Sequence, residues 1–254
     1  MHHTKAFEVH FNLIGHRYIK LLIATGASSS HLPYYAIDIP QERVWGWDYL
    51  NVLCTSLGFS DPVSCGTFPL GGGGGVSIDF AKPLYQFGLN GIQLSQPGQT
   101  FSLQPYGVLD SLPANYPGRN VPDVSFNADP ETGYIVYYTS DVNGFQILEN
   151  IGGTSAVAPQ LNGVAALLSQ YLNQRVGLLH IPLYLLALTG QAYGGPNPPL
   201  HAIAYGDNWF YHGSDGYNPG AGLGTLDVAN FANILRDPLS HLWDLSSAPA
   251  SSVQ

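Results

Sequence analysis

Charged side chains are scarce in this sequence, and cationic ones are the scarcest. Only 10% of the 254 residues are Asp, Glu, Lys or Arg, and eight residues are Lys or Arg, whereas an ordinary soluble domain has about 25% charged residues. Proteins that bind nucleic acid need a cationic surface to neutralise phosphates. With a net charge of -9, the composition predicts that nucleic acid is not a partner.

Cysteines and long apolar runs are also few. Cys54 and Cys65 are the two cysteines, too few for a metal site of their own. They fit either one disulfide in an exported protein or two free thiols. No apolar run is long enough to span a bilayer, and the first residues do not read as a signal peptide. The sequence therefore predicts no membrane association, and an exported form would need a signal outside these residues.

Glycine, by contrast, is plentiful, with 30 residues. Residues 71–75 are five consecutive glycines. Because glycine has no Cβ, such a run lets another stretch of backbone approach closely. No Gly-Lys-Ser or Gly-Lys-Thr follows the run, so it is not a phosphate-binding loop.

Short apolar runs and helical patterns alternate along the chain. An apolar run bounded by turn residues is typical of a strand, and apolar residues every three or four positions are typical of a helix. Strands are predicted at 18–24, 121–126 and 133–138, and helices at 7–15, 156–172 and 227–235. The alternation predicts an α/β fold with a parallel sheet. One domain is expected over residues 1–245, followed by a disordered tail at 246–254.

Ser155 stands just before the predicted helix at 156–172. Unpaired backbone N–H groups and the positive end of the helix dipole lie at such a position. Both can stabilise the alkoxide or oxyanion that a serine nucleophile requires. Local sequence alone favours a plainer explanation, in which Thr154 or Ser155 is the N-cap of the helix.

Four segments carry a resemblance that changes this weighting. They are residues 152–159 (Gly-Gly-Thr-Ser-Ala-Val-Ala-Pro), residues 119–125 (Arg-Asn-Val-Pro-Asp-Val-Ser), residues 127–134 (Asn-Ala-Asp-Pro-Glu-Thr-Gly-Tyr), and the glycine-rich residues 71–77 with Lys-Pro-Leu-Tyr-Gln at 82–86. In their order along the chain they resemble motifs of the sedolisins, the family of serine-carboxyl peptidases. Each segment alone would be a weak match, but together they are specific.

The resemblance implies a fold, an activity and a partner. The fold would be subtilisin-like, with this chain as the C-terminal part of the catalytic domain and the N-terminal part missing. The activity would be that of an acid serine-type endopeptidase or tripeptidyl-peptidase, with Ser155 as the nucleophile of a Ser-Glu-Asp triad. A carboxylate base suits a family that works at acidic pH. The substrate would be a peptide or protein, and the location extracellular.

The sequence departs from the family at the catalytic groups other than Ser155. Residues 24–29 match the oxyanion motif, but Ala27 stands at the position of its Asp. Loss of one oxyanion donor costs roughly 100- to 1,000-fold in rate. Glu8 is the single acidic residue before Ala27, and its surroundings do not match the family's Glu-x-x-x-Asp helix. No base is therefore assigned, and a missing N-terminal half-domain is the partner that would have to supply one.

The calcium site that the resemblance implies is also altered. Ala202 stands at the position of its first Asp, and Asn218 replaces the second. The remaining ligand positions are the backbone carbonyls of Ile203, Ser214 and Gly216, together with the Asn218 side chain. Calcium binds six to eight oxygens and depends on carboxylate charge. The sequence therefore predicts a degenerate site in which calcium binding is weak or lost.

Other polar and aromatic residues have plainer explanations. A histidine base for Ser155 would make the protein an esterase, but no spacing favours His180, His201 or His212 for that role. Asp129 precedes Pro130 and is most simply a turn residue. A set of aromatic residues before residue 50 is explained either as a peptide-binding surface or as a loop staple, the second being commoner. This set is Trp45, Trp47 and Tyr49.

Two functions therefore compete. The first is a peptidase that acts through a Ser155 acyl-enzyme, with its base supplied from elsewhere. The second is a non-catalytic pseudoprotease or peptide-binding remnant. The absent base, Ala27 and Ala202 favour the second for the isolated chain, whose status as an enzyme stays open.

Overall fold

The computed structural model describes residues 17–19, 23–24, 36–38, 42–96, 100–103, 107–111, 113–139, 144 and 146–237. The chain divides into two compact units, one of residues 1–42 with 130–152 and one of residues 43–129 with 153–254. The predicted helix at 7–15, the predicted tail at 246–254 and Ala27 lie outside the described residues.

The first unit is built from short strands. β1 (Arg17–Ile19) pairs antiparallel with β3 (Ala36–Asp38). β2 (Ile23–Ala24) pairs parallel with β8 (Tyr134–Thr139), which pairs antiparallel with β9 (Gln146–Ile151). The 3-10 turn η3 (Pro130–Thr132) precedes β8. The predicted strand at 133–138 is confirmed as β8, while the run at 18–24 contributes to two short strands.

Strand pairing in the described residues is mostly antiparallel. The sheets have two or three strands, and among the described strands only β2 and β8 pair in parallel. The predicted mixture of helices and strands is confirmed. The extended parallel sheet stays a prediction.

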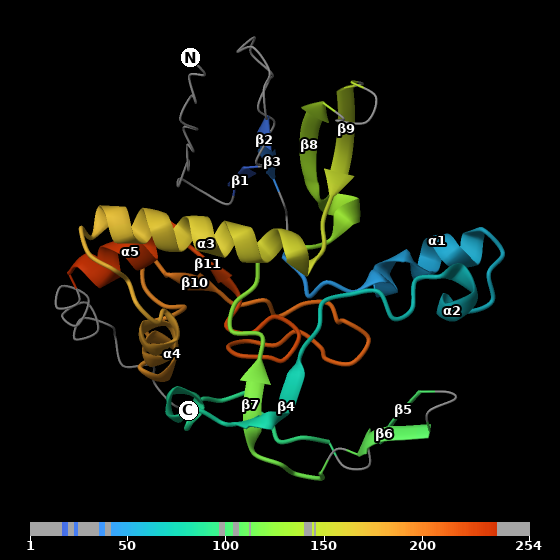
Figure 1. Ribbon diagram of the computed structural model, residues 1–254, viewed down its shortest axis with the longest axis horizontal. Helices are drawn as coiled ribbons and strands as arrows, with labels where there is room; N and C mark the ends of the chain where they lie inside the picture. The colour runs from blue at the N-terminus through green and yellow to red at the C-terminus, as the bar shows by residue number, and fades with distance from the viewer. Residues whose placement is uncertain are drawn as a thin grey trace, which may run out of the picture. The chain divides into compact units, whose positions relative to one another are not determined.

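The second unit has a core built around three helices. α3 (Thr154–Tyr171) lies alongside α5 (Val228–Arg236), and α4 (His180–Leu188) packs into the same core (Figure 1). The predicted helices at 156–172 and 227–235 are confirmed to within two residues. Asp227 caps α5, because its carboxylate accepts a hydrogen bond from the Asn230 N–H at 2.8 Å. The most deeply buried large side chains of this core are Tyr184, Tyr217, Phe231, Leu168, Leu200 and Leu223.

α4 and the shorter helical elements between residues 47 and 65 were not predicted from the sequence. α4 reads His-Ile-Pro-Leu-Tyr-Leu-Leu-Ala-Leu and is apolar on nearly every side, so it has no helical periodicity to detect. The others are η1 (Trp47–Leu50), α1 (Asn51–Ser56) and α2 (Pro62–Cys65). A disulfide joins Cys54 of α1 to Cys65 of α2, which decides between the two states left open for this pair.

The second unit also contains two antiparallel strand pairs. β4 (Gly75–Ala81) pairs with β7 (Gly118–Val121), and β5 (Thr100–Leu103) pairs with β6 (Gly107–Ser111). The 3-10 turn η2 (Leu84–Gln86) follows β4. The predicted strand at 121–126 is wrong, because β7 ends where that prediction begins. Pro122 follows directly and has no N–H to donate to a ladder.

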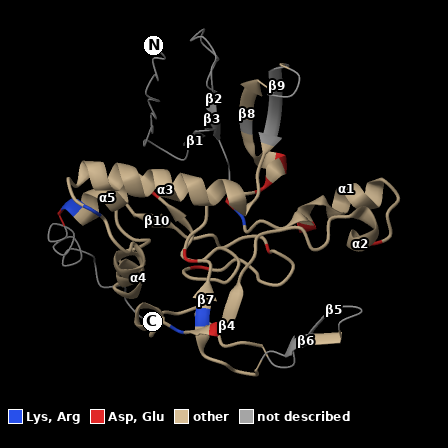
Figure 2. Cartoon of the chain, viewed as in Figure 1, with Lys and Arg blue, Asp and Glu red and all other residues tan. Residues whose placement is uncertain are grey.

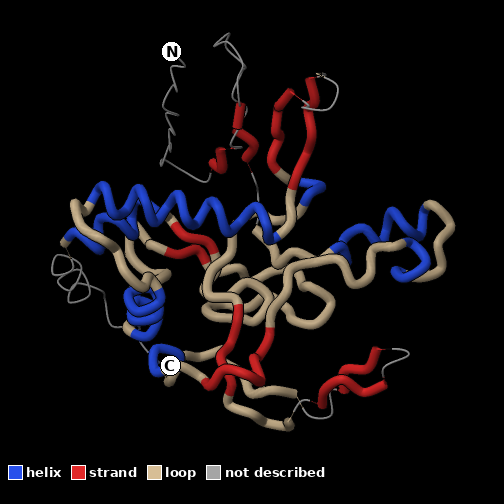
Figure 3. Tube along the Cα trace, in the orientation of Figure 1, coloured by secondary structure: helices blue, strands red, loops and turns tan. Residues whose placement is uncertain are grey.

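A long loop joins the last two strands. β10 (Leu200–His201) pairs antiparallel with β11 (Thr225–Leu226), and residues 202–224 between them form the loop drawn mostly in tan in Figure 3. The glycine run packs against this loop, because a Cβ added at Gly74 would collide with the carbonyl oxygen of Pro219. The predicted close approach of another backbone to residues 71–75 is therefore confirmed.

The surface reflects the composition. Lys and Arg are sparse on the ribbons that Figure 2 colours by charge. No helix in the described residues is long and apolar enough to cross a membrane.

Candidate functional site

Ser155 is the second residue of α3 and is exposed to solvent. Gly153 precedes the helix with φ 88° and ψ 159°, a conformation that favours glycine. Gly153 is the N-cap residue, and no side chain caps the helix, so the N-cap explanation of Thr154 or Ser155 is wrong. The Gly153 N–H donates to the carbonyl of Ala128, and the Ala156 N–H donates to the carbonyl of Gly153 at 3.0 Å. The turn before Ser155 is therefore held by backbone hydrogen bonds, and no described residue hydrogen-bonds to its hydroxyl.

The first turn of α3 carries backbone donors suited to an anion. Within the described residues, no acceptor takes the N–H groups of Thr154 and Ser155. N–H groups at a helix N-terminus, together with the dipole, favour negative charge. Pro159 is the sixth residue of α3. It has no N–H to donate to the carbonyl of Ser155, four residues earlier.

The buried carboxylate of Asp129 anchors the segment whose Ala128 carbonyl accepts the Gly153 N–H. Asp129 is 8% exposed and accepts hydrogen bonds from Trp47 Nε1 at 3.0 Å and Tyr49 Oη at 2.6 Å. Its neighbour Ala128 accepts the Gly153 N–H. The plain turn role predicted for Asp129 is therefore too simple, while the loop-staple reading of Trp47 and Tyr49 is confirmed. These hydrogen bonds could not be predicted from local sequence, because about 80 residues separate Asp129 from Trp47 and Tyr49.

A second carboxylate, Asp123, organises a polar cluster next to α4. Its Oδ2 accepts from Arg119 Nη2 at 2.5 Å and lies 3.1 Å from His180 Nε2. Its Oδ1 accepts from the hydroxyl of Tyr184 at 3.0 Å. Burial, together with the nearby Asp123 charge, raises the pKa of Tyr184 far above its ordinary value. Among the described residues no contact joins His180 to Ser155, and this cluster accounts for His180 as a structural residue.

The loop at 202–224 brings together three of the predicted calcium ligands. The Asn218 side chain is 2% exposed, and its Nδ2 donates to the carbonyls of Ile203 and Ser214, each at 3.1 Å. Gly216 lies between Ser214 and Asn218 in sequence with φ 76°. Ala202, which the resemblance predicts at the position of the first Asp, is partly buried and has no side-chain oxygen.

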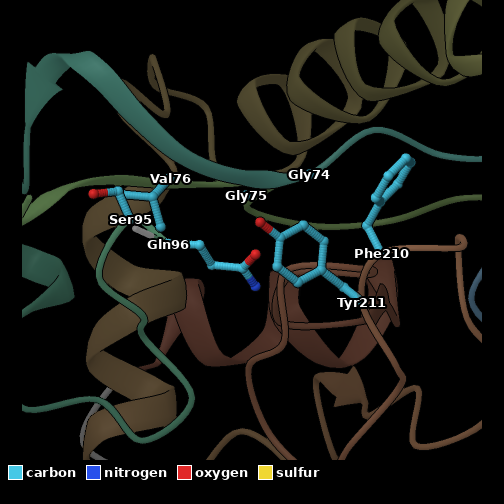
Figure 4. A pocket seen from close by; sticks show the side chains of 7 residues that line it. All are labelled: Gly74, Gly75, Val76, Ser95, Gln96, Phe210 and Tyr211. Carbon is cyan, nitrogen blue, oxygen red and sulfur yellow. The ribbon is translucent and has the colours of Figure 1, made fainter. Parts of the chain in front are cut away.

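The described residues also enclose a pocket apart from Ser155. Its volume is about 300 Å³, and Figure 4 shows the ring of Tyr211 pointing toward the Gly75 end of the glycine run. Burial raises the pKa of Tyr211 above its ordinary value. Ser155 does not line this pocket, so it is not the candidate active site. The lining residues are Gly74, Gly75, Val76, Ser95, Gln96, Phe210 and Tyr211.

Part of this sequence is similar to the sequences of known proteins. The chain is 34% identical over 159 residues to kumamolisin from Bacillus sp. (strain MN-32), which covers 60% of this chain and 23% of kumamolisin. It is 29% identical over 144 residues to sedolisin from Pseudomonas sp. (strain 101), which covers 52% of this chain and 22% of sedolisin. Part of this chain is sedolisin-like. No family model matches the chain.

The sedolisin-like relationship covers a limited share of the relatives. The chain spans about a quarter of the length of the curated sedolisins it matches. A solved structure of Pseudomonas sedolisin, complexed with two molecules of pseudo-iodotyrostatin, is 24% identical with a TM-score of 0.46. That similarity covers 65% of this chain and 36% of the solved one.

Within the sedolisin-like frame, the predicted site residues fall into three groups. Ser155 is described and exposed at the start of α3. Ala27, the residue at the oxyanion position, lies outside the described residues. Ile203, Ser214 and Asn218 are in contact around the Asn218 amide. Among the described residues, no group of three or more His, Cys, Asp or Glu side chains gathers as metal ligands.

Proposed function

We propose that this chain is a sedolisin-like serine peptidase domain in which Ser155 is the nucleophile, and that the chain by itself does not hydrolyse peptides. The observation that carries the proposal is the exposed Ser155 hydroxyl at the N-terminus of α3, inside the segment 152–159 that resembles the sedolisin nucleophile motif. The fold proposed for the domain is the subtilisin-like one, with a parallel sheet flanked by helices.

The chemistry would be acyl transfer from a peptide. The Ser155 oxygen would bond to the scissile carbonyl carbon, while its proton passes to a base and then to the departing amine as the C–N bond breaks. Water would then hydrolyse the ester and restore the hydroxyl. The N–H groups of Thr154 and Ser155 support this role, because donors at a helix N-terminus can stabilise a developing oxyanion.

The base is what the chain is proposed to lack. None of Glu8, Glu42, Glu131 and Glu149 is followed four residues later by Asp. Ala27 offers no proton at the oxyanion position. Activity would therefore need a partner, namely the N-terminal half of a sedolisin-like domain, with a peptide or protein as the substrate.

A hydrolysis assay tests the proposed inactivity of the chain by itself. The chain alone and its Ser155→Ala variant are incubated with a peptide library at about pH 3 to 7, the range in which a carboxylate base can work. We expect no release of peptide fragments from either protein, and no labelling of Ser155 by a peptide aldehyde. Hydrolysis that disappears in Ser155→Ala would contradict the proposed inactivity and keep Ser155 as nucleophile.

A complementation assay tests the nucleophile itself. An N-terminal sedolisin segment with its Glu-x-x-x-Asp helix is added to the Ala27→Asp variant, which restores the oxyanion acid. We expect hydrolysis that is lost in Ala27→Asp/Ser155→Ala and kept in Ala27→Asp/Thr154→Ala, the control for a neighbouring hydroxyl. Hydrolysis that survives the loss of Ser155 would exclude it as the nucleophile.

The competing candidate is a non-catalytic pseudoprotease or peptide-binding remnant. Ala27 and the missing Glu-x-x-x-Asp pattern favour it. It differs from the first proposal in the complementation assay, where it predicts no hydrolysis in any combination. Peptide binding that is unchanged by Ser155→Ala would support it.

A further inference from the structure

The side chain of Asn218 uses its whole hydrogen-bonding capacity inside the loop at 202–224. Its Nδ2 donates to the carbonyls of Ile203 and Ser214, each at 3.1 Å. Its Oδ1 accepts from the N–H groups of Gly220 at 3.1 Å and Ala221 at 2.9 Å. An amide offers two N–H donors and two acceptor lone pairs, and all four are used here.

The orientation of this amide follows from its partners. Reversing it would place Oδ1 against the carbonyl oxygens of Ile203 and Ser214, and the NH₂ group against two N–H donors. Either contact would leave buried polar groups unpaired, which costs about 1–3 kcal/mol per group. The nitrogen of Asn218 therefore faces the two carbonyls.

These residues do not fit a calcium ion. Calcium binds six to eight oxygens at 2.3–2.6 Å. The carbonyls of Ile203 and Ser214 already accept from Nδ2, and Oδ1 of Asn218 already accepts two N–H groups. Ala202 adds no side-chain oxygen. A cation between the two carbonyls would have to displace the amide nitrogen and gain no carboxylate in return.

The acidic residues near the loop do not supply the missing charge. Asp207 Oδ1 accepts from the Trp209 N–H at 2.8 Å, and Asp207 Oδ2 lies 3.7 Å from Nδ1 of His212. Asp215 is exposed to solvent. Both are explained without a metal.

We infer that the amide of Asn218 takes the place of a bound cation and closes the loop at 202–224 without metal. Two N–H donors on one nitrogen hold the carbonyls of Ile203 and Ser214 together, as a cation would. Backbone hydrogen bonds also hold the chain around Asn218. The Asn218 N–H donates to the Gly222 carbonyl at 3.0 Å, and the Gly222 N–H donates to the Asn218 carbonyl at 2.7 Å. This inference does not depend on whether Ser155 is catalytic.

The inference predicts that one substitution converts the loop into a calcium site. Asn218→Asp replaces the NH₂ group by a second carboxylate oxygen. That oxygen would face the carbonyls of Ile203 and Ser214, so all three become ligands that a divalent cation can bridge. Without a cation the same contacts are repulsive.

A matched control exists in the same loop. Asn208 is also 2% exposed, and its Oδ1 accepts from the N–H groups of Phe210 and Tyr211. Its Nδ2 donates to a single carbonyl, that of Gly72, at 2.8 Å. Asn208→Asp should lower stability in a similar way but create no site where two carbonyls converge on the new oxygen.

The experiment is thermal unfolding of the full chain and both variants in EDTA and in about 10 mM CaCl₂, well above the Kd of weak extracellular calcium sites. We expect the Tm of the wild type and of Asn208→Asp to change by less than about 2 °C between the two buffers. For Asn218→Asp we expect a low Tm in EDTA and a rise of about 5 °C or more with calcium.

Each outcome decides the inference. A wild-type Tm that rises with calcium overturns it, because the amide would not then replace the ion. An Asn218→Asp variant that ignores calcium, or that calcium does not help to refold, also overturns it. If Asn218→Asp is unfolded in EDTA, recovery of its circular dichroism signal on adding calcium supports the inference.

Discussion

Residues 152–159, called the nucleophile turn after the proposed role of Ser155, contrast with the loop at 202–224. The two regions differ in how completely their polar side chains are hydrogen-bonded. The segment 152–159 resembles the sedolisin nucleophile motif, yet its Ser155 is exposed and, within the described residues, its hydroxyl has no hydrogen-bond partner. The loop has Ala202 and Asn218 where the resemblance predicts carboxylates, and its Asn218 is buried and fully hydrogen-bonded. Agreement with a motif and completeness of a site are therefore separate properties.

The difference has a physical cause. A catalytic serine works through groups from distant segments, so its motif can be intact while the chemistry is incomplete. A structural loop needs only its buried polar groups paired, and an internal amide can meet that need as well as an ion can. Substitutions in the two regions should therefore differ sharply in their effect on stability.

The largest effect is expected from Asn218→Ala. The substitution leaves the carbonyls of Ile203 and Ser214 and two N–H groups without the amide, at about 1–3 kcal/mol for each group that water does not reach. We expect the free energy of unfolding to fall by about 3–5 kcal/mol, a large share of the 5–15 kcal/mol typical of a domain. Urea denaturation monitored by circular dichroism measures it.

Asn90→Ala is the control for this substitution. Asn90 is exposed in a turn, so its loss should change the free energy of unfolding by about 0.5 kcal/mol or less. Equal effects at the two positions would remove the contrast between a loop closed by its own amide and an ordinary surface asparagine.

A smaller effect is expected at alkaline pH through Tyr193, which ties the same loop to the core. Its hydroxyl donates to the carbonyl of Leu223 at 2.9 Å, and burial raises the pKa of Tyr193 to about 12. In the unfolded chain a tyrosine ionises near pH 10, so the unfolded state releases its proton first. The stability that Tyr193 contributes is therefore complete below about pH 10 and is lost between about pH 10 and 12.

The Tyr193→Phe variant measures this contribution. The full pKa difference would correspond to about 2.7 kcal/mol, and solvent screening of this partly exposed side chain reduces the expected loss to about 1 kcal/mol. Urea denaturation of both proteins at pH values from 8 to about 11 should show a shallower alkaline decline for Tyr193→Phe. Parallel declines would mean that other groups carry it, such as Tyr184 and Tyr217, whose pKa burial also raises.

Sequence predicted the elements whose pattern is local. α3 and α5 have helical periodicity, and β8 is an apolar run bounded by turn residues, so all three were predictable. α4 was not, because it is apolar on nearly every side, including the exposed Ile181, Leu185 and Leu188, and so has no polar face to detect. The strand predicted at 121–126 failed because apolar composition does not show that Pro122 interrupts the ladder.

The candidate site also contains features that are local in sequence and features that depend on the fold. Ser155 could be proposed as the nucleophile from sequence alone, because its motif is contiguous, and that role stays a prediction. The contacts of Asp129 with Trp47 and Tyr49, and of Asn218 with Ile203 and Ser214, depend on how loops fold back. The resemblance placed Ile203, Ser214, Gly216 and Asn218 together as calcium ligands, which stays a prediction, and it gave no sign that the Asn218 amide would donate to two of their carbonyls.

The smallest effect is expected from Ser155→Ala. The Ser155 hydroxyl is exposed and does not cap α3, and Ala has the higher helix propensity by a few tenths of a kcal/mol. We expect the free energy of unfolding to stay within about 0.5 kcal/mol of the wild type, or to rise slightly. A loss above about 1 kcal/mol in urea denaturation would show that the hydroxyl has a structural partner. Such a loss would bring the nucleophile turn closer to the Asn218 loop, because Ser155 would then be kept for folding rather than for chemistry.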